Sequence, residues 1–158
     1  MARIVSKEES KLLLKADGTW QHEGTPATHT GIKRFFHQQI RKDEDGKFFL
    51  YNAFERPEKN LTLEEHVYFE VEDTAYFVNS LKREDDAFVV ELNTGMRQPL
   101  DAHALTQNAE GVVYATLHSG DRARFSRHAM TQLEPYLEGD GDSVFIRDGS
   151  HRVPLPKI

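Results

Sequence analysis

The chain has 158 residues, no cysteine, and 20 Lys+Arg against 26 Asp+Glu, which gives a net charge of −6. This length suits one domain or two small interlocked ones with a sizeable core. The acidic balance disfavours binding to DNA or RNA polymers, because such binding depends on neutralising phosphates. Without cysteine there is no disulfide, thiolate zinc site or cysteine nucleophile. We expect a cytoplasmic protein that does not bind membranes, since neither a signal-peptide pattern nor a membrane-spanning apolar run is present.

The first predicted element is a β-hairpin. Its strands cover residues 12–15 and 19–22 and flank Asp17-Gly18, a dipeptide that supplies the positive φ of a tight turn. A helix to about Arg41 follows, capped by Thr28 or Thr30. The helix is predicted because one apolar face has the spacing i, i+3, i+4, i+8, formed by Ile32, Phe35, Phe36 and Ile40.

The middle of the chain alternates between polar and strand-like segments. An acidic turn over residues 43–46 precedes a short buried strand over residues 48–51. Residues 54–65 are polar and contain Pro57, so they are expected to form a loop. Hairpin-length connections then predict an antiparallel meander with strands at residues 66–71, 76–82, 87–93 and 96–100. Residues 101–111 are a polar connection and residues 112–118 a further strand.

The last third repeats the order of the first. A strand over residues 122–125 precedes a helix that Ser126 caps and that runs to about Leu137, and a strand over residues 144–147 and a closing hairpin follow. At one constant offset, Phe36, Ile40, Asp43, Asp45 and Phe48 align with Leu133, Leu137, Asp140, Asp142 and Phe145. We interpret this as internal duplication, with chance similarity of a common element order as the alternative.

The run from Trp20 to Thr25 holds the first candidate binding residues. Strand alternation places Trp20 and His22 on one face and Glu23 on the other, which separates the apparent His-Glu dyad. Trp20 is expected in the core, with stacking on a ligand as the alternative. His22 and Glu23 are expected at a pocket rim. Thr25 lies before a helix start, where free backbone N–H groups attract anions.

Two other segments carry candidate binding residues. Arg122 and Arg124 share a strand face within the most basic run of the chain, so they are either solvated or form a phosphate clamp. Asn93 and Thr94 lie in an Asn-Thr-Gly sequence that is either a hairpin turn or a loop closing a site.

No metal site or cofactor is predicted. His22, His29 and His37 are close in sequence, but they form no HExxH pattern, and the last two are too far apart on a helix for one ion. The aspartate-rich turns lack the terminal glutamate of a calcium loop.

Three segments together resemble the domain of unknown function 1285 family of uncharacterised bacterial proteins. They are ADGTWQHEGTP at residues 16–26, VEDTAYFV at residues 71–78, and ELNTGMRQPLDAHA at residues 91–104. The resemblance implies a β-rich α+β fold with internal duplication and a second half like a pleckstrin-homology barrel. It also implies a nucleotide-type ligand site between the halves and a role in signalling, without enzymatic activity. The chain departs from the family pattern after Arg56, where PEKNLTLEEHVYFE precedes VED.

We therefore predict an α+β protein of two related units, residues 1–64 and 65–158, each a curved antiparallel sheet with one helix, packed as one globule. The predicted function is a non-enzymatic binding or regulatory module for a small anionic, nucleotide-like ligand at the interface of the units. The predicted ligand-binding residues are Trp20, His22, Glu23, Thr25, Arg56, Asn93, Thr94, Arg122 and Arg124.

Two alternatives remain. One is a small hydrolase in which His22 or His29 acts as a general base beside Glu23. The other is a protein-protein adaptor without a ligand, whose contact edge is the acidic strand region of residues 64–73.

Overall fold

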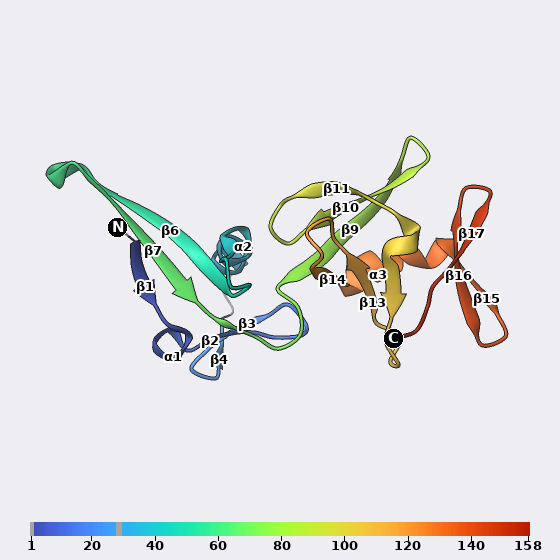
Figure 1. Ribbon diagram of the computed structural model, residues 1–158, viewed down its shortest axis with the longest axis horizontal. Helices are drawn as coiled ribbons and strands as arrows, with labels where there is room; N and C mark the ends of the chain where they lie inside the picture. The colour runs from blue at the N-terminus through green and yellow to red at the C-terminus, as the bar shows by residue number, and fades with distance from the viewer. Residues whose placement is uncertain (1, 28–29) are drawn as a thin grey trace. The chain divides into compact units, whose positions relative to one another are not determined.

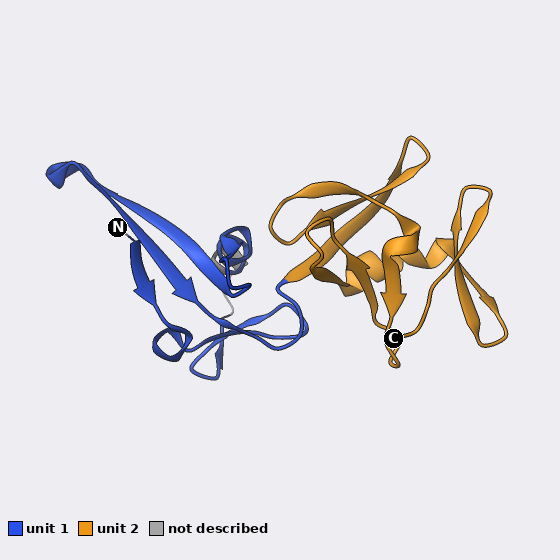
Figure 2. Cartoon of the chain, in the orientation of Figure 1, with its two compact units in different colours: residues 1–75 blue, residues 76–158 orange. Residues whose placement is uncertain are grey.

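The computed structural model describes residues 2–27 and 30–158, with the backbone alone for residues 30–32 (Figure 1). The chain divides into two compact units, Met1–Ala75 and Tyr76–Ile158 (Figure 2). The boundary expected from the sequence lies at residue 64 instead. The difference arises because β7 (Leu61–Tyr68) pairs along its whole length with β6 (Phe48–Arg56), which makes both strands part of unit 1.

Within its described residues, unit 1 contains two four-stranded sheets. The first has the order β1-β7-β6-β5, in which β1 (Ala2–Val5) is parallel to β7 and β5 (Ile40–Lys42) is antiparallel to β6. The second has the order β4-β3-β2-β8, formed by β2 (Leu12–Leu14), β3 (Trp20–His22), β4 (Thr25–Pro26) and β8 (Glu70–Val71). The helices of the unit are α1 (Lys7–Ser10) and α2 (Thr30–Gln38).

The predicted Asp-Gly hairpin is confirmed, with Leu14 opposite Trp20 and Leu12 opposite His22. Of the two predicted helix caps, Thr28 lies outside the described residues and Thr30 is the first residue of α2. The helix ends at Gln38 rather than near Arg41, because Ile40 already begins β5.

The loop predicted for residues 54–65 is wrong. Eight consecutive residue pairs join β6 to β7, from Phe49 opposite Tyr68 to Arg56 opposite Leu61. Only the tip is irregular: a 3₁₀ turn over Pro57–Lys59, then Asn60 with a left-handed φ of 51°. The segment is mostly polar and contains Pro57, and its apolar alternation is limited to Leu61 and Leu63, so its sequence pattern favours a loop.

Unit 2 is built on a six-stranded sheet of order β11-β10-β9-β14-β13-β12, as its described residues show. Its strands are β9 (Tyr76–Glu84), β10 (Ala87–Leu92), β11 (Arg97–Leu100), β12 (Leu105–Gln107), β13 (Val113–Thr116) and β14 (Arg122–Phe125). All pairs are antiparallel except β14 with β9. The helix α3 (Arg127–Leu133) precedes a three-stranded sheet of β15 (Leu137–Asp140), β16 (Ser143–Asp148) and β17 (His151–Pro154).

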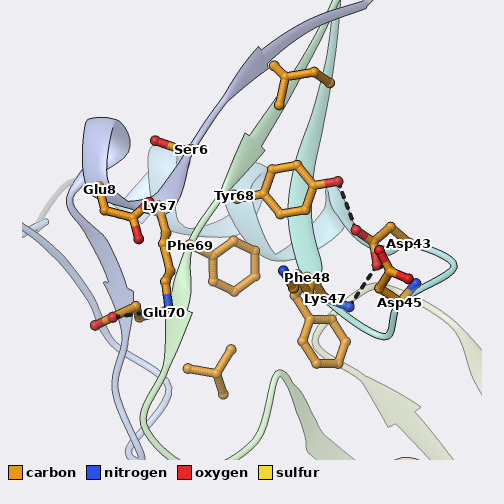
Figure 3. A pocket seen from close by; sticks show the side chains of 12 residues that line it. Ser6, Lys7, Glu8, Asp43, Asp45, Lys47, Phe48, Tyr68, Phe69 and Glu70 are labelled. Carbon is orange, nitrogen blue, oxygen red and sulfur yellow. Dashed lines mark hydrogen bonds and ion pairs between the residues drawn. The ribbon is translucent and has the colours of Figure 1, made fainter.

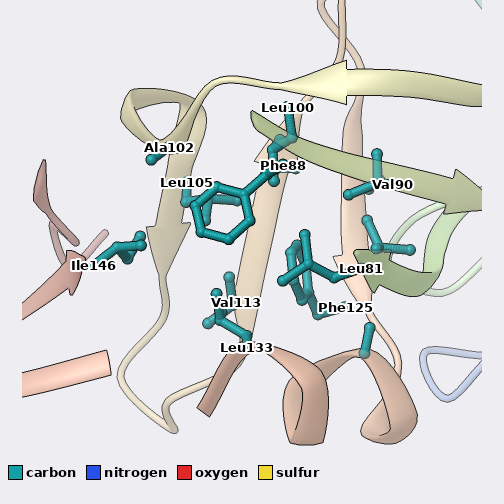
Figure 4. Close-up of a cluster of buried hydrophobic side chains, with 14 of the residues drawn as sticks. Leu81, Phe88, Val90, Leu100, Ala102, Leu105, Val113, Phe125, Leu133 and Ile146 are labelled. Carbon is teal, nitrogen blue, oxygen red and sulfur yellow. The ribbon is translucent and has the colours of Figure 1, made fainter. Parts of the chain in front are cut away.

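The core of unit 2 lies between the concave face of the curled sheet and α3 (Figure 4). On β10, Phe88, Val90 and Leu92 are buried in alternation with more exposed residues, as one buried face requires. On α3, Ala129 and Leu133 are one helical turn apart and both fully buried.

The predicted meander is confirmed only from β9 to β11. The strand predicted for residues 66–71 belongs to unit 1, where β8 pairs in parallel with β2. Strand β12 lies inside the segment predicted as a polar connection. The Ser126 cap is confirmed, since its side chain accepts the backbone N–H of Ala129, but α3 stops at Leu133 because Pro135 lies in a 3₁₀ turn.

The repeated element order is present in both units. Helix α2 is followed by the β5–β6 hairpin, and α3 is followed, after a 3₁₀ turn, by the β15–β16 hairpin; in both hairpins an acidic turn joins the two strands. Ile40 and Leu137, which align in the sequence, are the first residues of β5 and β15.

The predicted α+β class, with curled antiparallel sheets and a half-barrel in the second half, is confirmed. None of the helices in the described part of the chain is long and apolar enough to cross a membrane.

We predict that Trp20→Ala lowers the free energy of unfolding by about 3–5 kcal/mol, the usual cost of deleting a large buried aromatic side chain. Trp20 is 0% exposed. Urea unfolding followed by far-UV circular dichroism measures the loss. The control is Met96→Ala, since Met96 is 59% exposed and its removal should change stability by about 0.5 kcal/mol or less. Equal losses in the two variants would contradict the assignment of Trp20 to the core.

Candidate ligand-binding site

The first of the three family-like segments, called here the signature (residues 16–26), contains a tight turn from His22 to Thr25. Glu23 and Gly24 have φ values of 53° and 81°, and they join β3 to β4 with His22 opposite Thr25. Positive φ at both central residues is typical of a two-residue hairpin loop. Gly24 is therefore explained by backbone geometry, and the side chains of His22, Glu23 and Thr25 are all exposed.

Trp20 occupies the core of unit 1, as its core-packing interpretation predicts. Its ring packs edge-on against Phe69 at 4.8 Å and Phe36 at 5.5 Å between centroids, and against His37 at 5.6 Å. The indole Nε1 is buried and has no hydrogen-bond partner among the described residues. Such an unpaired donor costs about 1–3 kcal/mol, which the aromatic packing must offset. Because it is fully enclosed, Trp20 has no free face on which a ligand could stack.

The Glu23 side chain forms an ion pair within unit 1. Its carboxylate lies 3.2 Å from the ammonium group of Lys11, and its backbone N–H donates to the Lys11 carbonyl. The hydrogen bond from Lys11 is the main cause of a lowered Glu23 pKa. Glu23 is thus ionised and bound to Lys11 rather than placed to orient His22. His29 lies outside the described residues.

Arg56 is exposed at the far end of β6, in a different sheet from the signature hairpin. It lines a shallow hollow of about 340 Å³ at the tip of the β6–β7 ribbon, together with Glu55, Pro57, Asn60, Leu61 and Thr62.

The remaining predicted residues lie in unit 2. Asn93 is buried, and its Oδ1 accepts the backbone N–H of Phe77 while its own N–H donates to the Phe77 carbonyl. Arg124 is opposite Phe77 on the neighbouring strand, so Asn93 and Arg124 flank the same residue of β9. The guanidinium of Arg122 lies 4.5 Å from the centroid of the Tyr114 ring.

Arg122 and Arg124 do share one face of β14, because the residues that alternate with them are buried on the other face. Thr94 is a turn residue next to Asn93. Asn93 has a structural role, since its side chain holds the end of β10 against β9.

A groove of about 580 Å³ in unit 1 is a site that the sequence analysis missed (Figure 3). It lies between the β1–α1 junction, the acidic turn that joins β5 to β6, and the end of β7. Its lining comprises Ile4, Ser6, Lys7, Glu8, Asp43, Asp45, Lys47, Phe48, Tyr68, Phe69, Glu70 and Val71.

Aromatic rings form the base of the groove. Phe69 is 5% exposed and lies 6.5 Å from Phe48, with their ring planes 30° apart. From the other side, Phe69 packs on the fully buried Trp20. The signature tryptophan therefore supports this site from within the core and does not line it.

Hydrogen bonds to Asp43 hold one wall of the groove in place. Its Oδ1 accepts the backbone N–H groups of Asp45 at 2.9 Å and Lys47 at 2.8 Å, and its Oδ2 accepts the Tyr68 hydroxyl at 2.9 Å. The backbone hydrogen bond from Lys47 is the main cause of a lowered Asp43 pKa. The pKa of Tyr68 is raised, first by desolvation and then by its bond to Asp43. Near neutral pH Asp43 is therefore ionised and Tyr68 protonated.

The rim of the groove is charged. Lys7 lies 3.7 Å from Glu70 across its edge, while the exposed residues Glu8 and Asp45 lie on opposite walls. The full lining holds four carboxylates and two lysine ammonium groups, a formal charge of −2. The groove thus offers more hydrogen-bond acceptors and negative charge than cationic groups.

Only one part of the groove has a sequence signal. The acidic turn at residues 43–46 is visible in the sequence, but there it is explained as the end of a helix. The β1–α1 segment comes near this turn because β1 pairs with β7, a long-range pairing that no local pattern predicts. Among the described residues, no three His, Asp or Glu side chains are grouped as metal ligands.

The comparisons with known proteins concern the fold. No protein-family model matches the chain, and no curated protein matches it. The chain is similar to the crystal structure of a DUF1285 family protein from Silicibacter pomeroyi DSS-3, with a TM-score of 0.62, 16% identity, and coverage of 98% of this chain and 83% of that chain. It is also similar to a DUF1285 family protein from Shewanella baltica OS155, with a TM-score of 0.54, 19% identity, and coverage of 81% and 93% respectively. These likenesses confirm the fold expected from the sequence resemblance.

We predict that unit 1 loses stability as the pH falls through about 6.5. Burial of the His37 imidazole lowers its pKa below the ordinary 6.5, an effect that a contact between Nε2 and the Gly18 carbonyl at 3.1 Å only partly opposes. The unfolded chain therefore takes up this proton at a higher pH than the folded chain. The stabilisation is fully present above the unfolded pKa and is lost as the pH falls toward the folded pKa.

Urea midpoints measured between about pH 7.5 and about pH 5.5 test this, across the range in which histidine titrates. His37→Gln should flatten the decline, whereas His118→Gln, which changes an exposed histidine, should leave it as in the native chain. An unchanged pH dependence in His37→Gln would contradict the prediction.

Proposed function

We propose that this chain, which shares the fold of the two DUF1285 family proteins, is a non-enzymatic binding module whose ligand occupies the groove of unit 1. The observation that supports this is a hollow of about 580 Å³ with an aromatic base and a charged rim. Its volume lies within the range of about 300–1,000 Å³ that is usual for small-molecule sites. Its role is regulatory: an occupied groove signals the presence of the ligand.

The chemistry of the lining favours a small planar ligand that carries hydrogen-bond donors. Phe48 and Phe69 offer apolar ring surface to a flat molecule. Glu8 and Asp45 supply carboxylates, which accept strong hydrogen bonds from amino groups. An amino-substituted heteroaromatic ring, such as a nucleobase, combines both properties.

This narrows the ligand class expected from the sequence. A small anionic ligand would meet a lining with a net charge of −2, and Lys7 is already 3.7 Å from Glu70. We therefore favour a neutral or cationic ligand. The proposed ligand therefore has the planar base of the expected nucleotide-like ligand but lacks its phosphate group.

The titrating groups of the groove favour binding over acid–base catalysis. An efficient general acid or base has a pKa near the working pH. Asp43 and Tyr68 have pKa values that are displaced away from neutrality, downward for the carboxyl and upward for the phenol. In the hydrolase alternative, Glu23 is likewise held as a carboxylate by Lys11.

The adaptor alternative is less favoured, because the strand edge proposed for its protein contact is already paired within unit 1. Residues 64–67 of β7 lie between β1 and β6, so their backbone groups already pair on both sides. Glu70 and Val71 pair with β2.

We predict that adenosine perturbs the backbone amide resonances of the groove residues in NMR titrations at millimolar concentration. Asp45→Asn should weaken the affinity about tenfold, because a hydrogen bond to a charged acceptor contributes more than one to a neutral acceptor. AMP should bind more weakly than adenosine, since its phosphate meets the acidic rim.

The matched control is Glu44→Gln, which removes an exposed carboxylate from the same turn but outside the groove lining. It should leave the affinity unchanged. The proposal is contradicted if neither purine nor pyrimidine nucleosides shift the groove resonances, or if Glu44→Gln and Asp45→Asn weaken binding equally.

A further inference from the structure

The β6–β7 ribbon has an open edge. Strand β5 pairs with β6 only over Phe48–Leu50, and one more hydrogen bond joins the Tyr51 N–H to the Gln39 carbonyl at 2.9 Å. Beyond Tyr51, none of the described strands pairs with that side of β6. Figure 1 shows β6 and β7 continuing as a two-stranded ribbon past the point where β1 begins.

The backbone groups on this edge follow from the pairing pattern. In an antiparallel ladder, alternate residues direct their N–H and C=O groups to opposite sides. Tyr51 bonds toward the β5 side, so Ala53 and Glu55 direct their N–H and C=O groups to that same side. The register with β7 is unbroken over this stretch. Ala53 and Glu55 therefore have no backbone partner on this side among the described residues, and Phe54 lies between them.

One face of the ribbon is apolar and exposed. Phe54 is opposite Leu63, so both side chains lie on the same face, and Leu61 shares that face two residues along β7. Their exposed fractions are 45% for Phe54, 41% for Leu63 and 50% for Leu61. An open edge with an exposed apolar face is a template for adding another strand.

We propose that a second copy of this chain pairs with this edge, β6 against β6, around a two-fold axis at Phe54. The positions of the unpaired backbone groups select this register. Ala53 of each copy exchanges both hydrogen bonds with Glu55 of the other, and the two Phe54 side chains meet as a directly opposed pair. Opposed aromatic residues without a backbone bond between them approach most closely in an antiparallel sheet.

Charge complementarity supports a second copy as the occupant. In this register Arg56 is opposite Asn52 of the second copy, and within each copy Asn52 is opposite Glu65 on the same face. The long Arg56 side chain can therefore reach the carboxylate of Glu65 in the second copy, which also lies 3.7 Å from Arg3 of its own chain, and the two-fold axis repeats the contact. Arg56 has no ion pair among the described residues of its own chain.

The tip is also locally neutral. Glu55 and Glu58 balance Arg56 and Lys59, whereas the whole chain has a net charge of −6. On the other face, Glu55 is opposite Ala53 of the second copy, which is opposite Glu64 in its own chain, so two carboxylates also come near each other and weaken the contact. Pro57 ends the usable edge, because it has no N–H to donate. Such a short contact gives a weak, concentration-dependent dimer.

Disulfide trapping tests the register, since the native chain has no cysteine. Phe54→Cys places two thiols opposite each other on the two-fold axis, at a Cα separation that a disulfide accepts. Leu61→Cys is the control: it is equally exposed, but the two copies of residue 61 are three strand spacings apart across the sheet and four residues apart along it, about 19 Å in all. We expect mild oxidation to convert Phe54→Cys to a covalent dimer at least about tenfold faster than Leu61→Cys.

Sedimentation of the cysteine-free chain tests which edge is used. Ala53→Pro removes an N–H from the proposed edge, whereas Thr62→Pro removes one from the opposite edge of the same ribbon, because Thr62 is opposite Glu55. Mass should rise with concentration in the native chain and in Thr62→Pro, and Ala53→Pro should remain monomeric.

Three results would overturn the proposal. One is a native chain that stays monomeric up to millimolar concentration, which would leave the edge to an extended segment of another protein. The second is equal trapping of the two cysteine variants. The third is loss of the dimer in Thr62→Pro but not in Ala53→Pro.

Discussion

The packing of Trp20 against Phe69 is the contact on which unit 1 depends. The two rings meet edge-on at 4.8 Å, and they belong to strand β3 and to the residue between β7 and β8. Since β3 and β7 lie in different sheets, this contact joins the two sheets of the unit. It also fixes Phe69 as the base of the groove. A residue that resembles a ligand-binding tryptophan in the sequence thus acts on the proposed site through the core.

Hydrogen bonds between its own polar groups hold the groove in shape. Asp43 accepts three hydrogen bonds, two of which close the acidic turn while the third reaches Tyr68 at the end of β7. Pairing of this kind displaces pKa values away from neutrality and fixes the wall, so it suits recognition better than proton transfer. The carboxylates left at the rim, Glu8 and Asp45, are then the groups available to a ligand.

The β6–β7 ribbon presents a different physical problem. An antiparallel ribbon satisfies backbone groups along its centre and leaves alternate groups unpaired along each edge. In unit 1 these edges are covered by β1 and β5 near the core, and the cover ends before the tip. The apolar residues of the tip cannot join the core, so they are explained by a partner rather than by folding. Pairing with a second copy satisfies both the edge and the apolar face.

The sequence by itself determined the α+β class, the Asp-Gly hairpin, the Ser126 cap and the repeated helix–turn–strand order, because each depends on turn chemistry or on periodicity within a few residues. It left Trp20 with two roles, and it assigned the exposed β6–β7 ribbon to a loop, because residues 54–65 are mostly polar and contain Pro57. Only the tertiary structure decided where the groove lies. Its walls come from residues 4–8, 43–48 and 68–71, and the parallel pairing of β1 with β7 that gathers them is a long-range contact without a local sequence signal.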